Sequence, residues 1–394
     1  MSAPLSIGIV CFPSLGGSGI VATDLAVGLS LRGHRVHVIA SAPPSRTLPT
    51  CERLFLHEVP VPSHPALADP PYAIALASSL VEIAGDRGLD VVHVHYAVPH
   101  AASAYLARRV LGGAAPRIVT TLHGTDVTQI GSDPSYRAIT RFTVGRSDGI
   151  TVPSEYLKVE AYRRLGLSTD LPIDVIPNFV DTRHFTPVEH RDRRRFDALF
   201  DSAGGDPDDH GAPVLFHVSS FRPIKRVSDL VDVLAAVRRH TKARLMLVGD
   251  GPERARFMSR AREAGVARSI CLVGTHAEFV DYLRHADLFL LPSESESFGV
   301  AALEALSCGV PVAAYRVGGL PEVVTSEVGR LVEPRDVDAL AAAALEILSN
   351  HGLRETLSRA ARAHVTARFE RDGAMARYEE HYRRVLTAAP REDP

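Results

Sequence analysis

The chain alternates between short apolar runs and longer segments in which apolar residues recur at helical spacing. Glycine, proline or small polar residues bound each run, a pattern that predicts buried strands joined by turns. Alternating strands and helices predict an α/β fold with doubly wound parallel sheets. The predicted strands are residues 6–12, 36–40, 89–96, 117–122, 147–154, 173–181, 214–218, 243–248, 270–274 and 287–291, and the predicted helices include residues 17–32, 133–142, 227–239, 336–368 and 371–386.

This strand and helix pattern starts twice along the chain. A length of 394 residues exceeds what one ordinary core organises, which favours two domains. The chain turns polar after the strand at 173–181, and residues 204–211 are rich in Gly, Asp and Pro, as expected of an exposed loop. We therefore expect one domain over residues 1–183 and a second over 184–372.

Composition narrows the class of protein. Hydrophobic residues make up 45% and charged residues 23%, which is typical of a globular protein, and a net charge of −2 gives no reason to expect nucleic acid as a partner. The four cysteines show no C-x-x-C spacing, which favours reduced thiols. No signal peptide and no membrane-length apolar run is evident, so we expect a cytoplasmic protein with no membrane partner.

Two carboxylates lie in and after a predicted strand-to-helix turn within residues 293–311. Glu296 lies in the turn and Glu304 lies in the helix, so both are expected to face a ligand over the helix N-terminus. The free N–H groups there suit a phosphate, and carboxylates suit pairs of hydroxyl groups, which together favour a nucleotide sugar. The alternative is that Glu296 caps the helix and Glu304 is solvated, and spacing alone weighs the two interpretations evenly.

A glycine-rich loop precedes the first predicted helix. Gly17-x-Gly19-x-x-Ala22 matches a dinucleotide-binding pattern, but the second strand lacks the acidic residue that normally follows, so we expect no nicotinamide cofactor. The N–H groups around Gly17, Ser18 and Gly19 favour an anionic ligand. A tight turn with positive φ accounts for only some of these glycines.

Histidines gather at the carboxyl ends of two predicted strands, where ligands of open α/β sheets bind. His93 and His95 alternate onto one face, which allows a metal pair, but no third ligand is near and we favour hydrogen-bonded histidines. His123 follows the next strand and is as consistent with a site residue as with a loop histidine. The pair Asp206 and Asp208 lies in a loop that no strand delivers, and we expect no metal site there.

A basic loop over residues 219–226 follows the first strand of the second half. Arg222 and Lys225 would face the same crevice as the glutamates if both loops lie at strand carboxyl ends. There they would neutralise a diphosphate leaving group. The alternative is an exposed basic loop without a ligand.

The motif E-S-F-G-x-x-x-x-E, followed by A-x-x-C-G-x-P, resembles the signature of retaining GT-B glycosyltransferases of family 4. That resemblance implies two Rossmann-like domains that face a central cleft, with a last helix at 373–388 packing back on the first domain. It implies that Glu304 binds the ribose hydroxyls and Glu296 the donor sugar. The basic loop and the G-D-G-P turn at Gly249 also resemble segments of this family, and the resemblance implies that the basic loop binds phosphate.

Blocks at 11–19, 57–59, 93–100, 121–126, 131–134 and 219–226 resemble those members of the family that transfer GlcNAc from UDP-GlcNAc to L-malate, the first step of bacillithiol biosynthesis. Residues 152–154 and the loop at 201–212 depart from the usual pattern. The resemblance implies a retaining reaction without cofactor or metal, and a homodimer or higher homo-oligomer. The expected catalytic residues are Lys225, Arg222, Glu296 and His123. The expected donor-binding residues are Gly17, Ser219, Arg222, Lys225, Gly249, Gly274, Glu296, Ser297, Phe298, Gly299, Val300 and Glu304, and the expected acceptor-binding residues are Gly17, Ser18, Gly19, Tyr96, Thr125 and Arg141.

Three other functions remain open from the sequence. A related transferase with a lipid or polysaccharide acceptor would need a membrane-facing surface on the first domain. A UDP-GlcNAc 2-epimerase would release product without malate. A sugar-nucleotide-binding regulator would bind UDP and never turn over.

Overall fold

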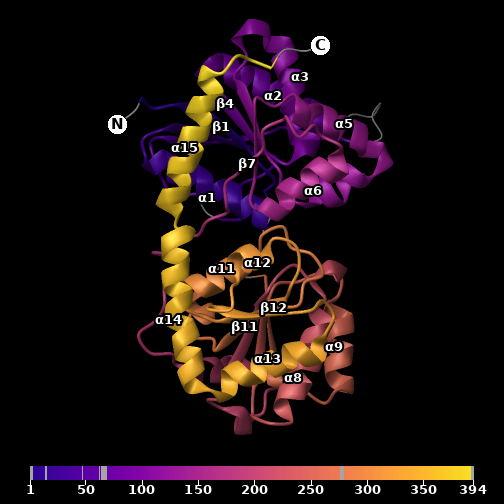
Figure 1. The fold of residues 1–394 in the computed structure, drawn as a ribbon, viewed down its shortest axis with the longest axis vertical. Helices are drawn as coiled ribbons and strands as arrows, with labels where there is room; N and C mark the ends of the chain where they lie inside the picture. The colour runs from indigo at the N-terminus through magenta and orange to yellow at the C-terminus, as the bar shows by residue number, and fades with distance from the viewer. Residues whose placement is uncertain are drawn as a thin grey trace. The chain divides into compact units, whose positions relative to one another are not determined.

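The computed structural model describes residues 3–13, 16–46, 48–61, 63, 69–275 and 279–391. The chain forms two compact units (Figure 1). Unit 1 comprises residues 1–178 and 371–394, and unit 2 comprises residues 179–370.

Unit 1 is built on a seven-stranded sheet in the order β3-β2-β1-β4-β5-β6-β7, in which all neighbouring strands run parallel. Its central strands are buried on both faces and mainly apolar, as a sheet covered on both sides requires. The strands are β1 (Ser6–Val10), β2 (Arg35–Ala40), β3 (Leu54–Glu58), β4 (Val91–His95), β5 (Arg117–Thr121), β6 (Gly149–Val152) and β7 (Asp174–Val175).

Helices cover both faces of this sheet (Figure 1). Val92 and Val94 of β4 pack in a core with α2 (Tyr72–Arg87) and α3 (Ala102–Leu111). His93 points to the opposite face, where its Nδ1 lies 2.8 Å from the Tyr382 hydroxyl of α15. The helices of unit 1 are α1 (Gly17–Leu31), α2, α3, α4 (Thr125–Thr128), α5 (Pro134–Gly145), α6 (Glu155–Leu165) and α15 (Arg371–Thr387).

Helix α15 is held in unit 1 by a buried glutamate. Both Glu379 carboxylate oxygens accept hydrogen bonds from Arg32, at 2.7 and 2.9 Å, and one lies 3.0 Å from His34 Nε2. The Arg32 hydrogen bond lowers the pKa of Glu379 more than burial raises it. Met375, one turn earlier, covers Gly28 of α1 so closely that a Cβ at Gly28 would lie 2.4 Å from the methionine sulfur.

We expect Glu379→Gln to lower the free energy of unfolding by about 1 kcal/mol at pH 7, a modest value because Arg32 is partly exposed. A lowered folded-state pKa means that the unfolded chain takes up the proton first as the pH falls. The Glu379 contribution is therefore lost at acid pH, and the difference from wild type should shrink toward pH 4. Urea unfolding at pH 7, 5.5 and 4 measures this. Glu380→Gln, an exposed neighbour on the same helix, is the control, and an equal loss in both variants would contradict the assignment.

Unit 2 contains a six-stranded parallel sheet in the order β10-β9-β8-β11-β12-β13. β8 and β11 are neighbours in it, with Leu215 beside Leu288 and Phe216 beside Phe289. Their carboxyl ends therefore lie at the same edge of the sheet. The strands are β8 (Val214–Val218), β9 (Arg244–Val248), β10 (Ile270–Gly274), β11 (Leu288–Leu291), β12 (Val312–Tyr315) and β13 (Gly329–Val332).

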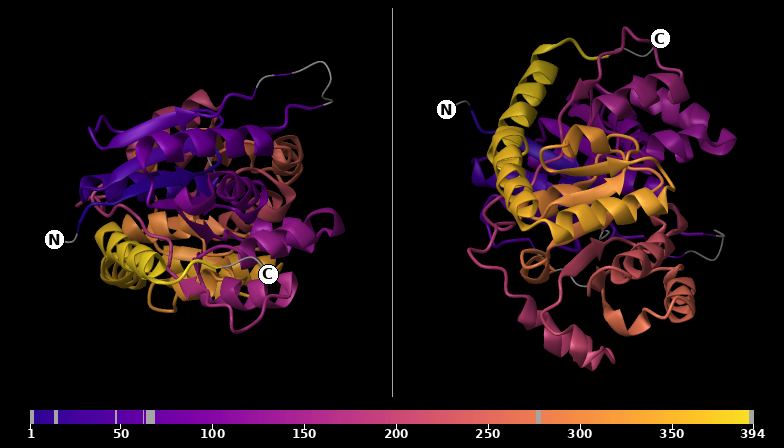
Figure 2. Two further views of the ribbon diagram at one scale, coloured as in Figure 1. Left: turned by 90° about the horizontal axis from the view of Figure 1, so that it is seen from above. Right: turned by 60° about the horizontal axis from the view of Figure 1, so that its bottom comes forward.

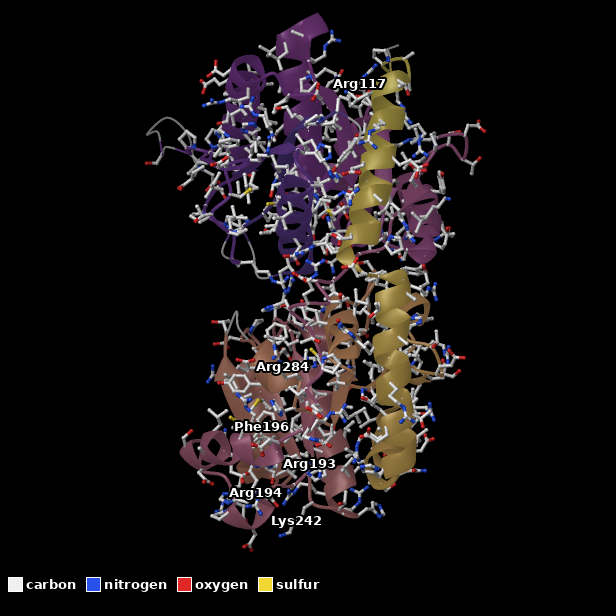
Figure 3. The ribbon with its side chains drawn as sticks, turned by 90° about the vertical axis from the view of Figure 1, so that its left-hand side faces the viewer. Arg117, Arg193, Arg194, Phe196, Lys242 and Arg284 are labelled. Atoms are coloured by element: carbon white, nitrogen blue, oxygen red, sulfur yellow. The ribbon has the colours of Figure 1, made fainter. Side chains whose placement is uncertain are left out.

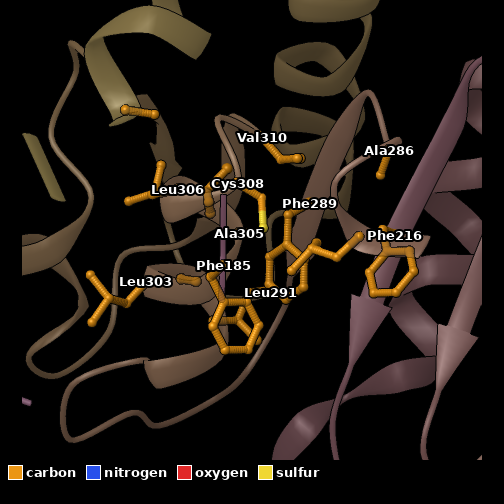
Figure 4. Close-up of a cluster of buried hydrophobic side chains, with 14 of the residues drawn as sticks. Phe185, Phe216, Ala286, Phe289, Leu291, Leu303, Ala305, Leu306, Cys308 and Val310 are labelled. Carbon is orange, nitrogen blue, oxygen red and sulfur yellow. The ribbon is translucent and has the colours of Figure 1, made fainter. Parts of the chain in front are cut away.

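Separate hydrophobic cores form on the two faces of this sheet. On one face, Phe216, Phe289 and Leu291 pack with Leu303 and Leu306 of α11 (Figure 4). The opposite core includes α8, α9 and α13, and the further views of Figure 2 show these elements. The helices of unit 2 are α7 (Asp197–Ser202), α8 (Val227–Arg238), α9 (Arg254–Glu263), α10 (Val280–Leu283), α11 (Val300–Ser307), α12 (Leu320–Val323), α13 (Val337–Ser349) and α14 (His351–Arg368).

One helix prediction differs from the structure. The segment 336–368 is two helices because Asn350 ends α13 and its side chain accepts the Leu353 N–H at 3.0 Å, which caps α14. Helix α11 begins at Val300, because Gly299 before it has a φ of 99° that a helix does not permit. Within the ranges described above, no helix combines the length and the apolar character needed to cross a membrane.

Candidate functional site

Two loops of unit 2 meet where β8 and β11 end. The β8 loop comprises residues 219–226 and the β11 loop residues 292–299. The Lys225 ammonium donates to Glu296 Oε1 at 2.6 Å, and the Glu294 N–H donates to the Ile224 carbonyl at 2.8 Å. Both side chains of the ion pair remain partly exposed, at 21% for Lys225 and 13% for Glu296. The expected cation and carboxylate are therefore brought together within reach of a ligand.

The turn before α11 is shaped by glycine. Gly299 adopts a φ of 99°, and a Cβ added there would lie 2.5 Å from Leu320 Cδ1. The Glu296 carbonyl accepts the Gly319 N–H at 3.0 Å, which fixes the turn from the other side. The first N–H groups of α11, beginning at Val300, have no partner within the helix and carry the positive end of its dipole. Ser297 lies between the fixed carbonyl and this helix start.

Glu304 and Phe298 are both buried in the structure. Glu304 lies four residues after the first residue of α11 and is 4% exposed. A carboxylate buried to this degree is unusual, which favours a ligand-binding role over the solvated alternative. Phe298 is 1% exposed and packs edge-on against Phe369, with ring centroids 5.7 Å apart. Any donor contact of Phe298 would therefore come from its backbone.

A buried histidine, His217, determines the direction of the hydrogen bond that the Ser219 hydroxyl makes. His217 Nδ1 lies 2.8 Å from the Leu290 carbonyl, which only accepts, so this nitrogen carries the proton. Burial lowers the pKa of His217 to about 4, so the ring is neutral and its Nε2 accepts from the Ser219 hydroxyl at 2.7 Å. Ser219 Oγ then has only lone pairs left and suits a hydroxyl or N–H of a ligand rather than a phosphate oxygen. His217 was not among the predicted site residues, because it lies within an otherwise apolar strand.

Gly249 and Gly274 line the same edge of the sheet. The Gly249 N–H donates to the Gly274 carbonyl at 2.7 Å. Gly249 has a φ of 129°, and a Cβ there would lie 1.8 Å from the Ser219 carbonyl oxygen. Only glycine fits this close approach of backbone to backbone.

The arginines of the β8 loop differ in their partners. Arg226 is engaged by Asp229 through two hydrogen bonds of 2.9 and 3.1 Å, and Asp229 also accepts from the Tyr315 hydroxyl. Arg222 is exposed, and its Nε donates to Ser220 Oγ at 3.2 Å. Arg222 is therefore available to an anionic ligand, whereas Lys225 must first leave its pair with Glu296.

In unit 1, histidines at the ends of β4 and β5 bond to one another. His95 Nδ1 lies 2.9 Å from His123 Nε2, and both rings are nearly or fully buried. Both nitrogens of His93 are engaged, at 2.8 Å with Tyr382 and at 2.6 Å with Thr121. Hydrogen bonding, rather than a metal pair, therefore describes these residues. Across the described ranges, no group of three or more metal-ligating side chains is present.

Asp126 fixes the loop that carries His123. Its carboxylate accepts the N–H groups of His123 at 3.0 Å, Gly124 at 2.8 Å and Ala97 at 3.4 Å. Burial raises the pKa of Asp126 to about 6, although the backbone hydrogen bonds oppose the rise. Asp126 lies in the block at 121–126 that resembles the family, but its structural role depends on backbone groups that the sequence does not identify.

Tyr96 lies directly against His123. The two rings stack at 5.5 Å with an interplanar angle of 22°, and Phe12 packs edge-on against Tyr96 at 5.3 Å. Tyr96 has a φ of 87°, which is rare for a residue with a side chain and typical of functional loops. Thr125 follows as the first residue of the short helix α4. Tyr96, His123 and Thr125 thus gather near the carboxyl ends of β4 and β5.

The glycine-rich loop leads directly into α1. Gly16 is the N-cap and makes no side-chain hydrogen bond, and the first turn contains no acidic residue. The N–H groups at the helix start, around Gly17, Ser18 and Gly19, are therefore suited to an anion. Ser14 and Leu15 of the same loop lie outside the described residues.

The prediction that Arg141 binds the acceptor stays a prediction. Arg141 is exposed on α5, and a Cβ at Gly166 would lie 3.6 Å from one guanidinium nitrogen. Gly166 caps the C-terminal end of α6.

Two known protein families match this chain, one over its first half and one over its second. Residues 15–184 match the family "Glycosyltransferase Family 4", and residues 206–364 match "Glycosyl transferases group 1". Among solved structures, sucrose-phosphate synthase from Thermosynechococcus elongatus superposes with a TM-score of 0.78 at 22% identity, covering 98% of this chain and 100% of that one. Anabaena HepE in complex with UDP-glucose gives a TM-score of 0.76 at 19% identity, covering 95% and 98%. These similarities confirm the predicted GT-B fold.

A curated relative matches over the whole length. The N-acetyl-alpha-D-glucosaminyl L-malate synthase of Bacillus anthracis is 38% identical over 383 residues, which is 97% of this chain and 97% of the relative. On this evidence the chain belongs to the family 4 glycosyltransferases.

Proposed function

We propose that this glycosyltransferase moves GlcNAc from UDP-GlcNAc to the hydroxyl group of L-malate with retention at the anomeric carbon. The observation that carries the proposal is the 38% identity to an N-acetyl-alpha-D-glucosaminyl L-malate synthase, because it spans 97% of both chains. The similarity therefore includes unit 1, where the acceptor is expected, and is not confined to the motif that family members share.

The loops of unit 2 supply what a UDP leaving group needs. Lys225 and Arg222 would neutralise the diphosphate together with the N–H groups at the start of α11. In the ligand-free chain Lys225 is paired with Glu296, at 2.6 Å. When Lys225 turns to the diphosphate, the Glu296 carboxylate is released to accept a sugar hydroxyl, and Glu304 accepts from the ribose. These cations perform the task that a metal ion has in other transferases, so we propose a metal-independent reaction.

The acceptor half of the reaction is assigned to unit 1. Malate is a small dianion, which suits the N–H groups at Gly17 to Gly19 and the hydroxyls of Thr125 and Tyr96. Its hydroxyl oxygen forms the new bond to the anomeric carbon on the face from which UDP departs. The bond from that carbon to the β-phosphate oxygen breaks, and a phosphate oxygen takes the malate proton. No protein nucleophile is required, and His123 is assigned to the sugar.

The experiment is to measure UDP release from UDP-GlcNAc in the presence of EDTA, with and without L-malate, and to determine the anomeric configuration of the product by NMR. We expect malate-dependent release and an α-linked GlcNAc-malate. Release without malate would indicate hydrolysis or epimerisation, and tight UDP binding without turnover would indicate a regulator. Turnover only with a lipid or polysaccharide acceptor would show that L-malate is not the acceptor, while UDP-GlcNAc would remain the donor.

A further inference from the structure

The ring of His123 is fixed from several sides by its surroundings. Its backbone N–H is held by Asp126 at 3.0 Å, and one face of the ring lies against Tyr96. Its Nε2 is turned to His95 Nδ1, at 2.9 Å. Because Nε2 is engaged and the residue as a whole is 9% exposed, Nδ1 is the nitrogen left for a ligand.

One proton lies between His95 and His123, and the surroundings of His95 decide which ring holds it. His95 is fully buried, and its Nε2 has no hydrogen-bond partner among the described residues. A proton on that nitrogen would be a buried N–H donor without an acceptor, which is rare in proteins, whereas an unused lone pair is better tolerated. The His95 proton is therefore on Nδ1 and is donated to His123 Nε2.

Neither ring is expected to carry a second proton near neutral pH. Burial, assisted by the neighbouring histidines, lowers the pKa of His95 well below its usual value and that of His123 to about 3. A neutral His123 whose Nε2 accepts a hydrogen bond must hold its own proton on Nδ1. His100 steadies the same strand end, since its Nδ1 donates to the His95 carbonyl at 2.5 Å.

We infer that His95 is a positioning residue that holds His123 as the tautomer protonated on Nδ1, so that His123 presents a hydrogen-bond donor to an oxygen of the substrate. This inference rests on the proposed transfer reaction for its functional consequence. A hydroxyl or carboxylate oxygen is the matching chemistry. In this tautomer His123 has no free lone pair and cannot act as the base for the malate proton, which agrees with proton transfer to the departing phosphate.

The test begins with the ligand-free full chain labelled with ¹⁵N-histidine. Long-range ¹H–¹⁵N correlation spectra distinguish protonated from bare ring nitrogens, and His123→Gln identifies the His123 signals among the 18 histidines. We expect a protonated Nδ1 and a bare Nε2 in the wild type. In His95→Leu the donor to Nε2 is lost, and the His123 proton should redistribute to Nε2. A wild-type His123 protonated on Nε2 would overturn the inference, whatever the variants do.

Kinetics supply the second measurement. We expect kcat to fall about tenfold in His95→Leu, as for the loss of one buried hydrogen bond, and to recover in His95→Asn, whose amide nitrogen replaces Nδ1–H. His37→Leu is the control, because His37 is also buried in this sheet and lies 2.8 Å from another histidine, His57. Unchanged tautomer and kcat in His95→Leu would overturn the inference. If malate is not the acceptor but the tautomer is as expected, the proposed function fails and the assignment of His95 stands.

Discussion

Lys225→Met is expected to lower kcat for UDP-GlcNAc turnover by about 1,000-fold, the range found when a preorganised group that stabilises developing charge is removed. Methionine keeps much of the length of the side chain but has no charge to place on the diphosphate. The fold should persist, because the Lys225–Glu296 pair is partly exposed and its loss costs only about 1 kcal/mol. Initial rates of UDP release, with a thermal melt of each variant, measure both effects.

Lys242→Met is the matched control for this change. Lys242 belongs to the same unit and is exposed, and it lies two residues before the start of β9, so it is at the amino ends of the strands (Figure 3). The Lys225 loop follows the carboxyl end of β8. The control should therefore retain wild-type kcat. A folded Lys225→Met variant with kcat within about threefold of wild type would remove Lys225 from the catalytic group, since so small a change is under 1 kcal/mol of barrier.

Much of the fold was evident from apolar runs, and the exceptions have physical reasons. Strands such as β1, β4 and β8 are largely buried and stand out as mainly apolar segments, interrupted only by a glycine or by histidines. Strand β3 was not predicted, because it is an edge strand with exposed and intermediate residues rather than a buried run. β12 was missed because two of its four residues are alanine, which has little preference for strands.

The candidate site was predictable in its chemistry but not in its pairings. Lys225 and Glu296 are 71 residues apart, and only the pairing of β8 with β11 makes them neighbours. The roles of His217 and Asp126 depend on bonds to backbone groups, which the side-chain sequence does not reveal. The role of Arg141 stays a prediction, because helical spacing does not say which neighbour an exposed arginine lies beside. The carboxyl ends of the predicted strands indicated where candidate site residues gather, because a parallel sheet places these ends at one edge.

The second large effect is expected at Gly249, where backbone conformation and packing both require glycine. Gly249→Ala would place a Cβ 1.8 Å from the Ser219 carbonyl oxygen at a φ of 129°, and backbone on both sides leaves little room for adjustment. We expect unfolding free energy to fall by about 3 kcal/mol, which corresponds to a drop in Tm of roughly 6 to 12 °C. The Gly249→Ala protein that does fold should bind UDP-GlcNAc more weakly than wild type, because the Ser219 backbone must move.

Gly265→Ala separates the two causes. Gly265 also has a positive φ, 71°, but a Cβ there meets nothing within 4 Å. This variant should lose only about 1 kcal/mol, the conformational cost of alanine in the left-handed region. Thermal unfolding of both variants followed by circular dichroism, with KM for UDP-GlcNAc, gives the comparison. Equal Tm losses would mean that the contact with Ser219 adds nothing to the cost of φ. A much larger loss at Gly249, together with a raised KM, would tie the glycine to the close approach of the β8 loop and so to the donor site.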